Sequence, residues 1–130
     1  MKSILFIIWV VAITAPSVVP YSNNVAISFK LTESGMVVHF MAYFVAAVLF
    51  YWAYGKDTLF SILFSGFSIF MFSVVLEIVQ FHLLYRTFNP IDIAGNACGI
   101  LFFIFVWMSL WKRGMRKLER GNRKWEKGRK

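Results

Sequence analysis

The stretch EIVQFHLLYRTFNPIDIAGNACG, Glu77 to Gly99, decides the fold, because it ends one apolar helix, turns, and begins the next. Glu77 and Gln80 lie three residues apart and therefore share one face of the first helix. Asp92, Asn96 and Gly99 follow at spacings of four and three, and they share one face of the second helix. Ionisable side chains near the end of a membrane helix are costly and usually face protein or water. The stretch therefore predicts a polar cluster around which the other helices pack.

The composition places the chain in the membrane class. Its 130 residues allow one domain, and 59% of them are hydrophobic while only 15% are charged. The net charge of +8 lies entirely in residues 112–130, because the basic and acidic residues of the remainder cancel. Cys98 is the only cysteine, which excludes an internal disulfide and a cysteine-based metal site. No cofactor and no metal are expected.

Four apolar segments predict an all-α membrane protein, a four-transmembrane-helix bundle with short loops. A bilayer core requires ~20 residues of apolar helix. The expected spans are 4–19, 35–54, 58–84 and 90–111. Together they form a transmembrane domain over residues 1–111. The first segment, which follows Lys2, also fits a cleaved signal peptide ending at Ala15, but Ile13 suits such a cut poorly and favours a retained helix. The short turn at 55–57 predicts that the second and third helices are antiparallel neighbours.

The basic residues predict the orientation of the bundle. Residues 112–130 follow the last span directly, so the C-terminus is expected in the cytoplasm. Four spans then place the N-terminus in the cytoplasm as well. The turn between the third and fourth spans faces outward, and with it the polar cluster. Asn89 fits the N-cap of the fourth span, Pro90 its first helical position, and Asp92 its first turn.

The basic tail, residues 112–130, contains a seven-residue repeat, RGMRKLE followed by RGNRKWE. As a helix it would carry one apolar stripe among cations and could lie on an anionic membrane surface. Its three glycines each cost about 1 kcal/mol relative to alanine in a helix, and they favour a mostly disordered tail. Nothing in the repeat reads nucleic-acid bases, so no nucleic-acid partner is expected.

His39 adds a third ionisable group to the cluster. It lies four residues after Gly35, about 6 Å into the second span, and Glu77 lies about 10 Å from the end of the third. His39, Glu77 and Asp92 are therefore expected at similar depth, and they are the candidate catalytic residues. Each also has a structural interpretation, in hydrogen bonds between helices or at a helix terminus.

Several segments resemble the VanZ-like family of small bacterial membrane proteins, over about residues 35–110. The matching positions are His39, Phe40, Tyr43, Glu77, Gln80, Arg86, Asp92, Asn96 and Gly99. The run from Arg86 to Gly99 is the most specific part. The family usually has Asp-Lys before the histidine, where this chain has Gly35 and Met36. The resemblance implies a place in the inner membrane of a bacterium, a link to the cell envelope, and a link to susceptibility to teicoplanin-type glycopeptides.

Three functions fit these residues. The first is binding of an anionic lipid or a lipid-linked cell-wall or polysaccharide precursor, with Tyr43, Gln80, Arg86 and Asn96 as the binding residues. The second is a membrane assembly partner in which polar groups only specify packing, and in which Gly95 and Gly99 bring helices together. The third is an enzyme acting on a lipid headgroup or a lipid-linked phosphate. The sequence has no nucleophile elbow, phosphate loop or HExxH motif, and it leaves the oligomeric state open.

Overall fold

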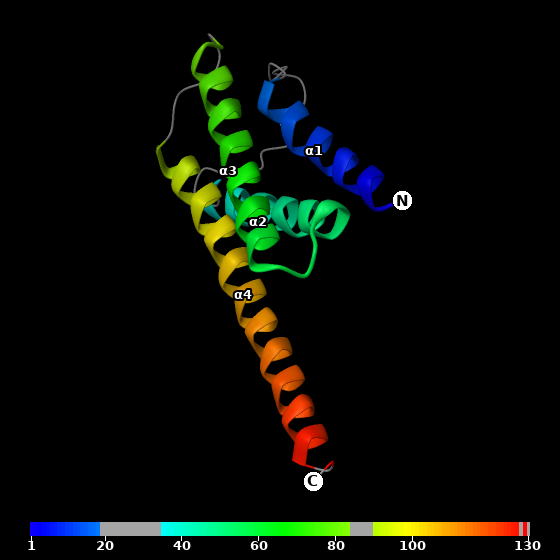
Figure 1. Ribbon diagram of the computed structural model, residues 1–130. Coiled ribbons are helices and arrows are strands. Elements are labelled where there is room, and N and C mark those ends of the chain that lie inside the picture. The colour runs from blue at the N-terminus through cyan, green and yellow to red at the C-terminus, as the bar shows by residue number, and fades with distance from the viewer. Residues whose placement is uncertain (19–34, 84–89, 128, 130) are drawn as a thin grey trace.

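The computed structural model describes residues 1–18, 35–83, 90–127 and 129, and within them every regular element is an α-helix. Figure 1 shows the four helices, which are α1 (Lys2–Val18), α2 (Gly35–Tyr54), α3 (Leu59–Phe81) and α4 (Pro90–Lys127). The predicted loop at 20–34 lies outside the described residues, as do the predicted N-cap Asn89 and Arg86.

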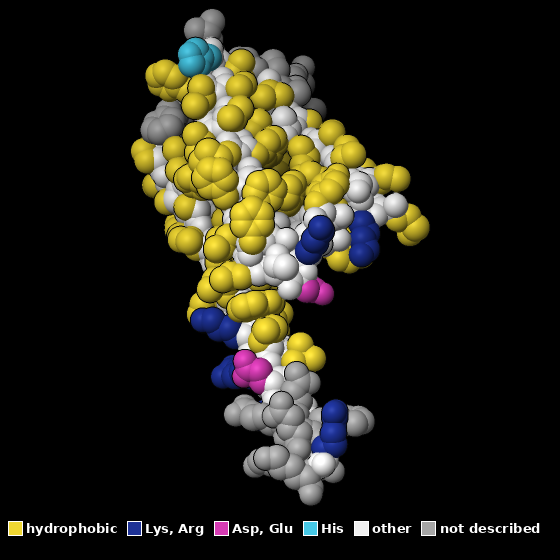
Figure 2. Space-filling model, in the orientation of Figure 1, with side chains coloured by type: hydrophobic (Ala, Val, Ile, Leu, Met, Phe, Trp, Pro, Cys, Tyr) yellow, Lys and Arg dark blue, Asp and Glu magenta, His cyan; other side chains and the backbone are white. Residues whose placement is uncertain are grey.

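Three of these helices are long and apolar enough to cross a membrane. They are α2, α3 and the Pro90–Gly121 part of α4, with 20, 23 and 32 residues. A helix of 20 residues extends about 30 Å, which is the thickness of a bilayer core. Large apolar side chains such as Phe60, Phe67 and Phe105 are more than half exposed, as expected for a surface that faces lipid. Figure 2 shows such side chains covering the helical body. The chain is therefore a membrane protein.

The first helix is shorter than these three. α1 has 17 residues, and its apolar part, Lys2–Pro16, is not long enough to count with the three spans. It nevertheless packs on α2, since the indole of Trp9 donates a hydrogen bond to the carbonyl oxygen of Ala42 at 3.0 Å. The ring of Phe6 meets that of Phe50 edge-on, with 5.3 Å between centroids.

Contacts between helices give their relative directions. In α2 and α4, the start of one meets the start of the other at Met36 and Gly95, and their later parts meet at Tyr51 and Trp107, so these two helices run in the same direction. α3 runs against α4, because Gly66 near its start lies against Ile104 while Glu77 near its end reaches Asn96. The direction of α3 relative to α2 is thus the antiparallel one that the short turn predicts.

Two glycines bring α2 and α4 into close contact. A Cβ atom added to Gly95 would lie 2.8 Å from the carbonyl oxygen of Met36, and one added to Gly99 would lie directly against the carbonyl oxygen of Phe40. Any larger residue would force two backbones apart. Gly95 and Gly99 therefore allow the helix contact that the small-residue spacing predicts.

α3 begins and ends close to the predicted positions. Thr58 is its N-cap, and its hydroxyl oxygen accepts a hydrogen bond from the backbone N–H of Ser61 at 3.2 Å. The helix ends at Phe81, with His82 as C-cap, rather than at 84 as predicted from hydropathy. Residue 84 itself lies outside the described part of the chain.

α4 does not end at Trp111. It continues without a break to Lys127, so the expectation of a mostly disordered tail is wrong for residues 112–127. The physical reason is that an apolar span has already nucleated the helix, and extending a helix is far less costly than starting one. Arg, Lys and Glu are good helix formers, and here they offset the cost of Gly114 and Gly121. Figure 1 shows the end of α4 projecting well past the other helices.

Candidate functional site

The predicted polar residues meet at one end of the helical body. His39 lies four residues after the start of α2, Asp92 two after the start of α4, and Glu77 four before the end of α3. Since α2 and α4 run against α3, these three positions lie at the same level. The basic residues of α4 lie toward its other end, which projects beyond the other helices (Figure 1).

Asn96 connects the ionisable groups. The Nδ1 atom of His39 donates a hydrogen bond to Oδ1 of Asn96 at 2.8 Å. The side-chain amide of Asn96 donates in turn to Oε1 of Glu77, at a long 3.5 Å. The other ring nitrogen of His39, Nε2, lies 3.7 Å from Oδ2 of Asp92. We call these four residues the polar cluster; it joins α2, α3 and α4.

The polar cluster has a buried base and an accessible rim. Asn96 is fully buried and Glu77 is 6% exposed. The side chains of His39 and Asp92 are 27% and 24% exposed, so both are partly accessible. Asn96 uses both ends of its amide within the protein, and it therefore acts by positioning His39 and Glu77.

The geometry of the His39 ring defines what the rim can bind. Because Nδ1 donates to an amide oxygen, Nδ1 carries a hydrogen. Nε2 is then free either to accept a hydrogen bond from a bound group or, in the imidazolium form, to donate one. The gap of 3.7 Å to Asp92 exceeds a direct hydrogen bond and leaves Nε2 oriented toward the rim rather than tightly paired.

Two further predicted residues lie around His39. The ring of Tyr43 stacks on the His39 ring, with 6.4 Å between centroids, and Tyr43 is only 5% exposed. Gln80 is half-buried, one turn beyond Glu77, and no partner of its side chain lies in the part of the chain that the structure describes. Arg86, the predicted phosphate ligand, is outside that part.

Gly95 has a second role that its spacing did not reveal. A Cβ atom there would lie 3.0 Å from Cβ of His39, so a larger residue would displace the histidine from Asn96. Gly35 differs, since a Cβ atom there would make only an ordinary contact of 3.6 Å with Oδ1 of Asp92. Gly95 therefore positions His39 as well as the two helices. The only sign in the sequence of the contact between Gly95 and His39 is that a small residue comes directly before Asn96.

The described residues contain no candidate metal site. No three His, Cys, Asp or Glu side chains come close enough together there to hold a metal ion. Cys98 is exposed on α4, so it does not take the packing position that its apolar surroundings suggest. What the polar cluster offers is a set of hydrogen-bond donors and acceptors, with one imidazole and one carboxylate within reach of a ligand.

Comparison of the chain with protein-family models, with curated proteins and with solved structures finds no match in any of the three.

Proposed function

We propose that this chain is a VanZ-like membrane protein whose polar cluster binds the headgroup of an anionic lipid or of a lipid-linked cell-envelope precursor. The single observation that carries the proposal is the accessible His39–Asp92 rim above a buried Asn96–Glu77 base. Two partly exposed ionisable side chains at the end of an apolar bundle are costly, and function is the usual reason for such a cost.

The proposed binding uses the atoms at the rim. His39 donates from Nε2 to a phosphate oxygen, and Asp92 accepts from a hydroxyl or amine of the same headgroup. Arg86, six residues before Asp92 in the sequence, supplies a second cation for the phosphate. Asn96 keeps the His39 ring in the orientation that presents Nε2. Binding of a wall precursor would alter the target of a teicoplanin-type glycopeptide and thereby the susceptibility of the cell.

The proposal includes a topology. All four helices span the inner membrane of a bacterium, both termini are cytoplasmic, and the polar cluster faces outward. The packing of α1 on α2 supports a retained first helix. The position of the basic residues of α4, at the end away from the polar cluster, supports the orientation.

The two histidines of the chain provide a matched test of the site. His39→Gln is expected to weaken binding of a polyprenyl pyrophosphate, in nanodiscs of phosphatidylcholine, by about tenfold, the effect of one charge-assisted hydrogen bond. Arg86→Ala should act in the same direction. His82→Gln should change binding less than twofold, because His82 is bonded to the carbonyl oxygen of Ile78 in its own helix. Equal binding by all of these variants and the unaltered chain would exclude the proposal.

Labelling tests the orientation. In a Cys98→Ser background, single cysteines at Lys2, Lys56 and Arg129 are expected to resist a membrane-impermeant maleimide added to intact cells. All three should react once the cells are opened. Reaction of the Arg129→Cys variant in intact cells would place the basic end outside and reverse the topology.

A structural role for the polar cluster is the second candidate. It is favoured by Asn96, which is fully buried and links α2 to α3 through protein contacts alone. In that case His39→Gln would reduce the amount of folded protein without changing headgroup affinity per folded molecule.

A further inference from the structure

The extension of α4 beyond Trp111 is a second feature that the proposed function does not use. Five of the ten residues from Lys112 to Gly121 are basic and one, Glu119, is acidic. With a rise of 1.5 Å per residue, Arg113 to Lys117 lie roughly 3–9 Å past Trp111 along the helix axis. The headgroup layer on each side of a bilayer core is about 5–8 Å thick. With the fourth span ending at Trp111, as the sequence predicts, these cations lie at the depth of lipid phosphates.

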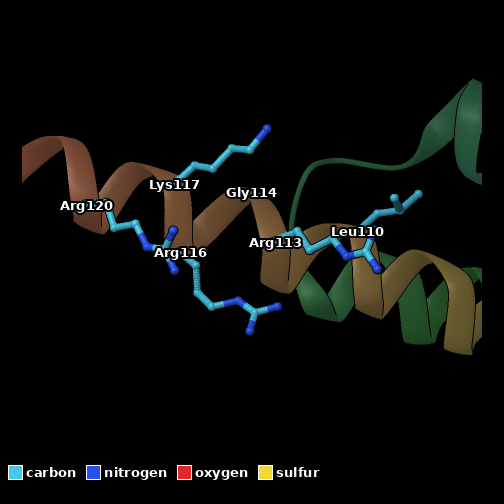
Figure 3. Close-up of a pocket in the computed structure, with 6 residues that line it drawn as sticks. All are labelled: Leu110, Arg113, Gly114, Arg116, Lys117 and Arg120. Atoms are coloured by element: carbon cyan, nitrogen blue, oxygen red, sulfur yellow. The ribbon is translucent and has the colours of Figure 1, made fainter.

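Four of the cations share one face of this extension. Arg113, Arg116, Lys117 and Arg120 follow the spacing i, i+3, i+4, i+7 and surround an open hollow of about 640 Å³ together with Leu110 and Gly114. Figure 3 shows the four side chains extending from adjacent turns of α4, with no acidic side chain among the residues that line the hollow. We call this set the cationic face. Its charge is complementary to phosphate.

An apolar hollow adjoins the cationic face. It has a volume of about 560 Å³ and lies between α4, Tyr51 near the end of α2 and Ile62 near the start of α3. Trp107, Trp111 and Leu118 of α4 contribute to its lining, and Asp57 is the one acidic residue in it. The two hollows share Leu110, Gly114 and Lys117. Gly114 has open space around it, since a Cβ atom there would meet nothing within 4 Å. The charged and the apolar hollow are therefore neighbours, and Gly114 lies on the boundary that they share.

We infer that this junction binds an anionic phospholipid of the membrane leaflet at the basic end of the bundle. The phosphate lies on the cationic face, and the glycerol and upper acyl chain lie in the apolar hollow beside Leu110 and Trp107. A free phosphate would use only the first hollow, and a neutral lipid only the second. Binding here is independent of the polar cluster, which lies at the other end of the molecule.

The charge requirement is tested with two fourfold variants of the full-length protein. Native mass spectrometry measures phosphatidylglycerol and phosphatidylcholine retained by the detergent-solubilised chain. Replacing Arg113, Arg116, Lys117 and Arg120 by Gln is expected to lower phosphatidylglycerol affinity at least about tenfold, since each cation near an anionic surface contributes a factor of about five. The matched control replaces Arg123, Lys124, Lys127 and Arg129 by Gln, which removes the same charge further along the chain, and it should retain most of the affinity. Equal loss in both variants would overturn the proposal, and so would no loss in either.

Two variants that leave the charge unchanged test the boundary between the two hollows. Gly114→Leu fills the junction and is expected to reduce phosphatidylglycerol retention at least about threefold, a partial loss because the cations remain. Gly121→Leu adds the same side chain at a glycine that is equally open and should leave retention unchanged. Inorganic phosphate should not displace the lipid. Displacement of the lipid by phosphate, or by a single-stranded RNA at equal charge, would identify a different ligand and overturn the proposal. Equal phosphatidylglycerol retention by the two leucine variants would also overturn it.

Discussion

Replacing Gly99 with alanine is expected to destabilise the folded protein by about 3 kcal/mol, the upper range for adding one methyl group to a tightly packed contact. The new Cβ atom would lie against the carbonyl oxygen of Phe40 and 3.1 Å from the backbone nitrogen of Phe44. Both atoms belong to the backbone of α2, so no side chain can move aside and the helices must separate. Unfolding of the purified protein in mixed micelles with increasing SDS measures the change.

Gly114→Ala is the control for this prediction. It makes the same substitution in the same helix, at a position where the added Cβ atom meets nothing within 4 Å. It should stabilise the protein slightly, by up to about 1 kcal/mol, because alanine has the higher helix propensity. Similar stabilities of the two variants would contradict the close approach of α2 and α4.

Replacing Asn96 with leucine, a side chain of similar size, is expected to cost about 2 kcal/mol of stability. The change removes the hydrogen bonds to His39 and Glu77 and places an apolar side chain against the buried Glu77 carboxyl group. Individual hydrogen bonds between membrane helices average only about 0.6 kcal/mol, so most of the cost comes from the groups that lose their partner. The same unfolding assay measures it.

Ser73→Ala provides the comparison for Asn96. Ser73 is buried to the same degree, but its hydroxyl bonds to the carbonyl oxygen of Phe70 within α3. Its loss should cost less than about 1 kcal/mol. In addition, the double variant Glu77→Gln with Asn96→Leu should cost less than the sum of the two single changes, because the residues share one interaction. Strict additivity would show that the Asn96–Glu77 hydrogen bond does not contribute.

The sequence predicted the components of the site and their depth. Glu77, Asp92 and Asn96 could be placed on helix faces by their spacing, and His39 could be placed at the same level by counting residues from the ends of the spans. Spacing along a helix gives depth and relative direction but not the rotation of one helix against another. The convergence of these side chains on Asn96 therefore became visible only in the packed structure.

The length of α4 shows a different limit. Three glycines in a basic repeat favour disorder when the tail is considered alone, yet residues 112–127 continue an existing helix. Propensity is a local quantity, and the cost of nucleation is carried here by an apolar span more than a turn away. The hollows beside Gly114 follow from that continuity, since they depend on α4 keeping its helical form past the end of α2.

The placement of α1 has a consequence for the chemistry at the rim. Its helix contacts in the described chain are with α2 and α3, and none of the four cluster side chains belongs to it. A chain from which the N-terminal segment had been removed would still contain all four side chains of the polar cluster. Whether α1 is retained and whether the polar cluster binds a headgroup are thus separate questions, which separate experiments can answer.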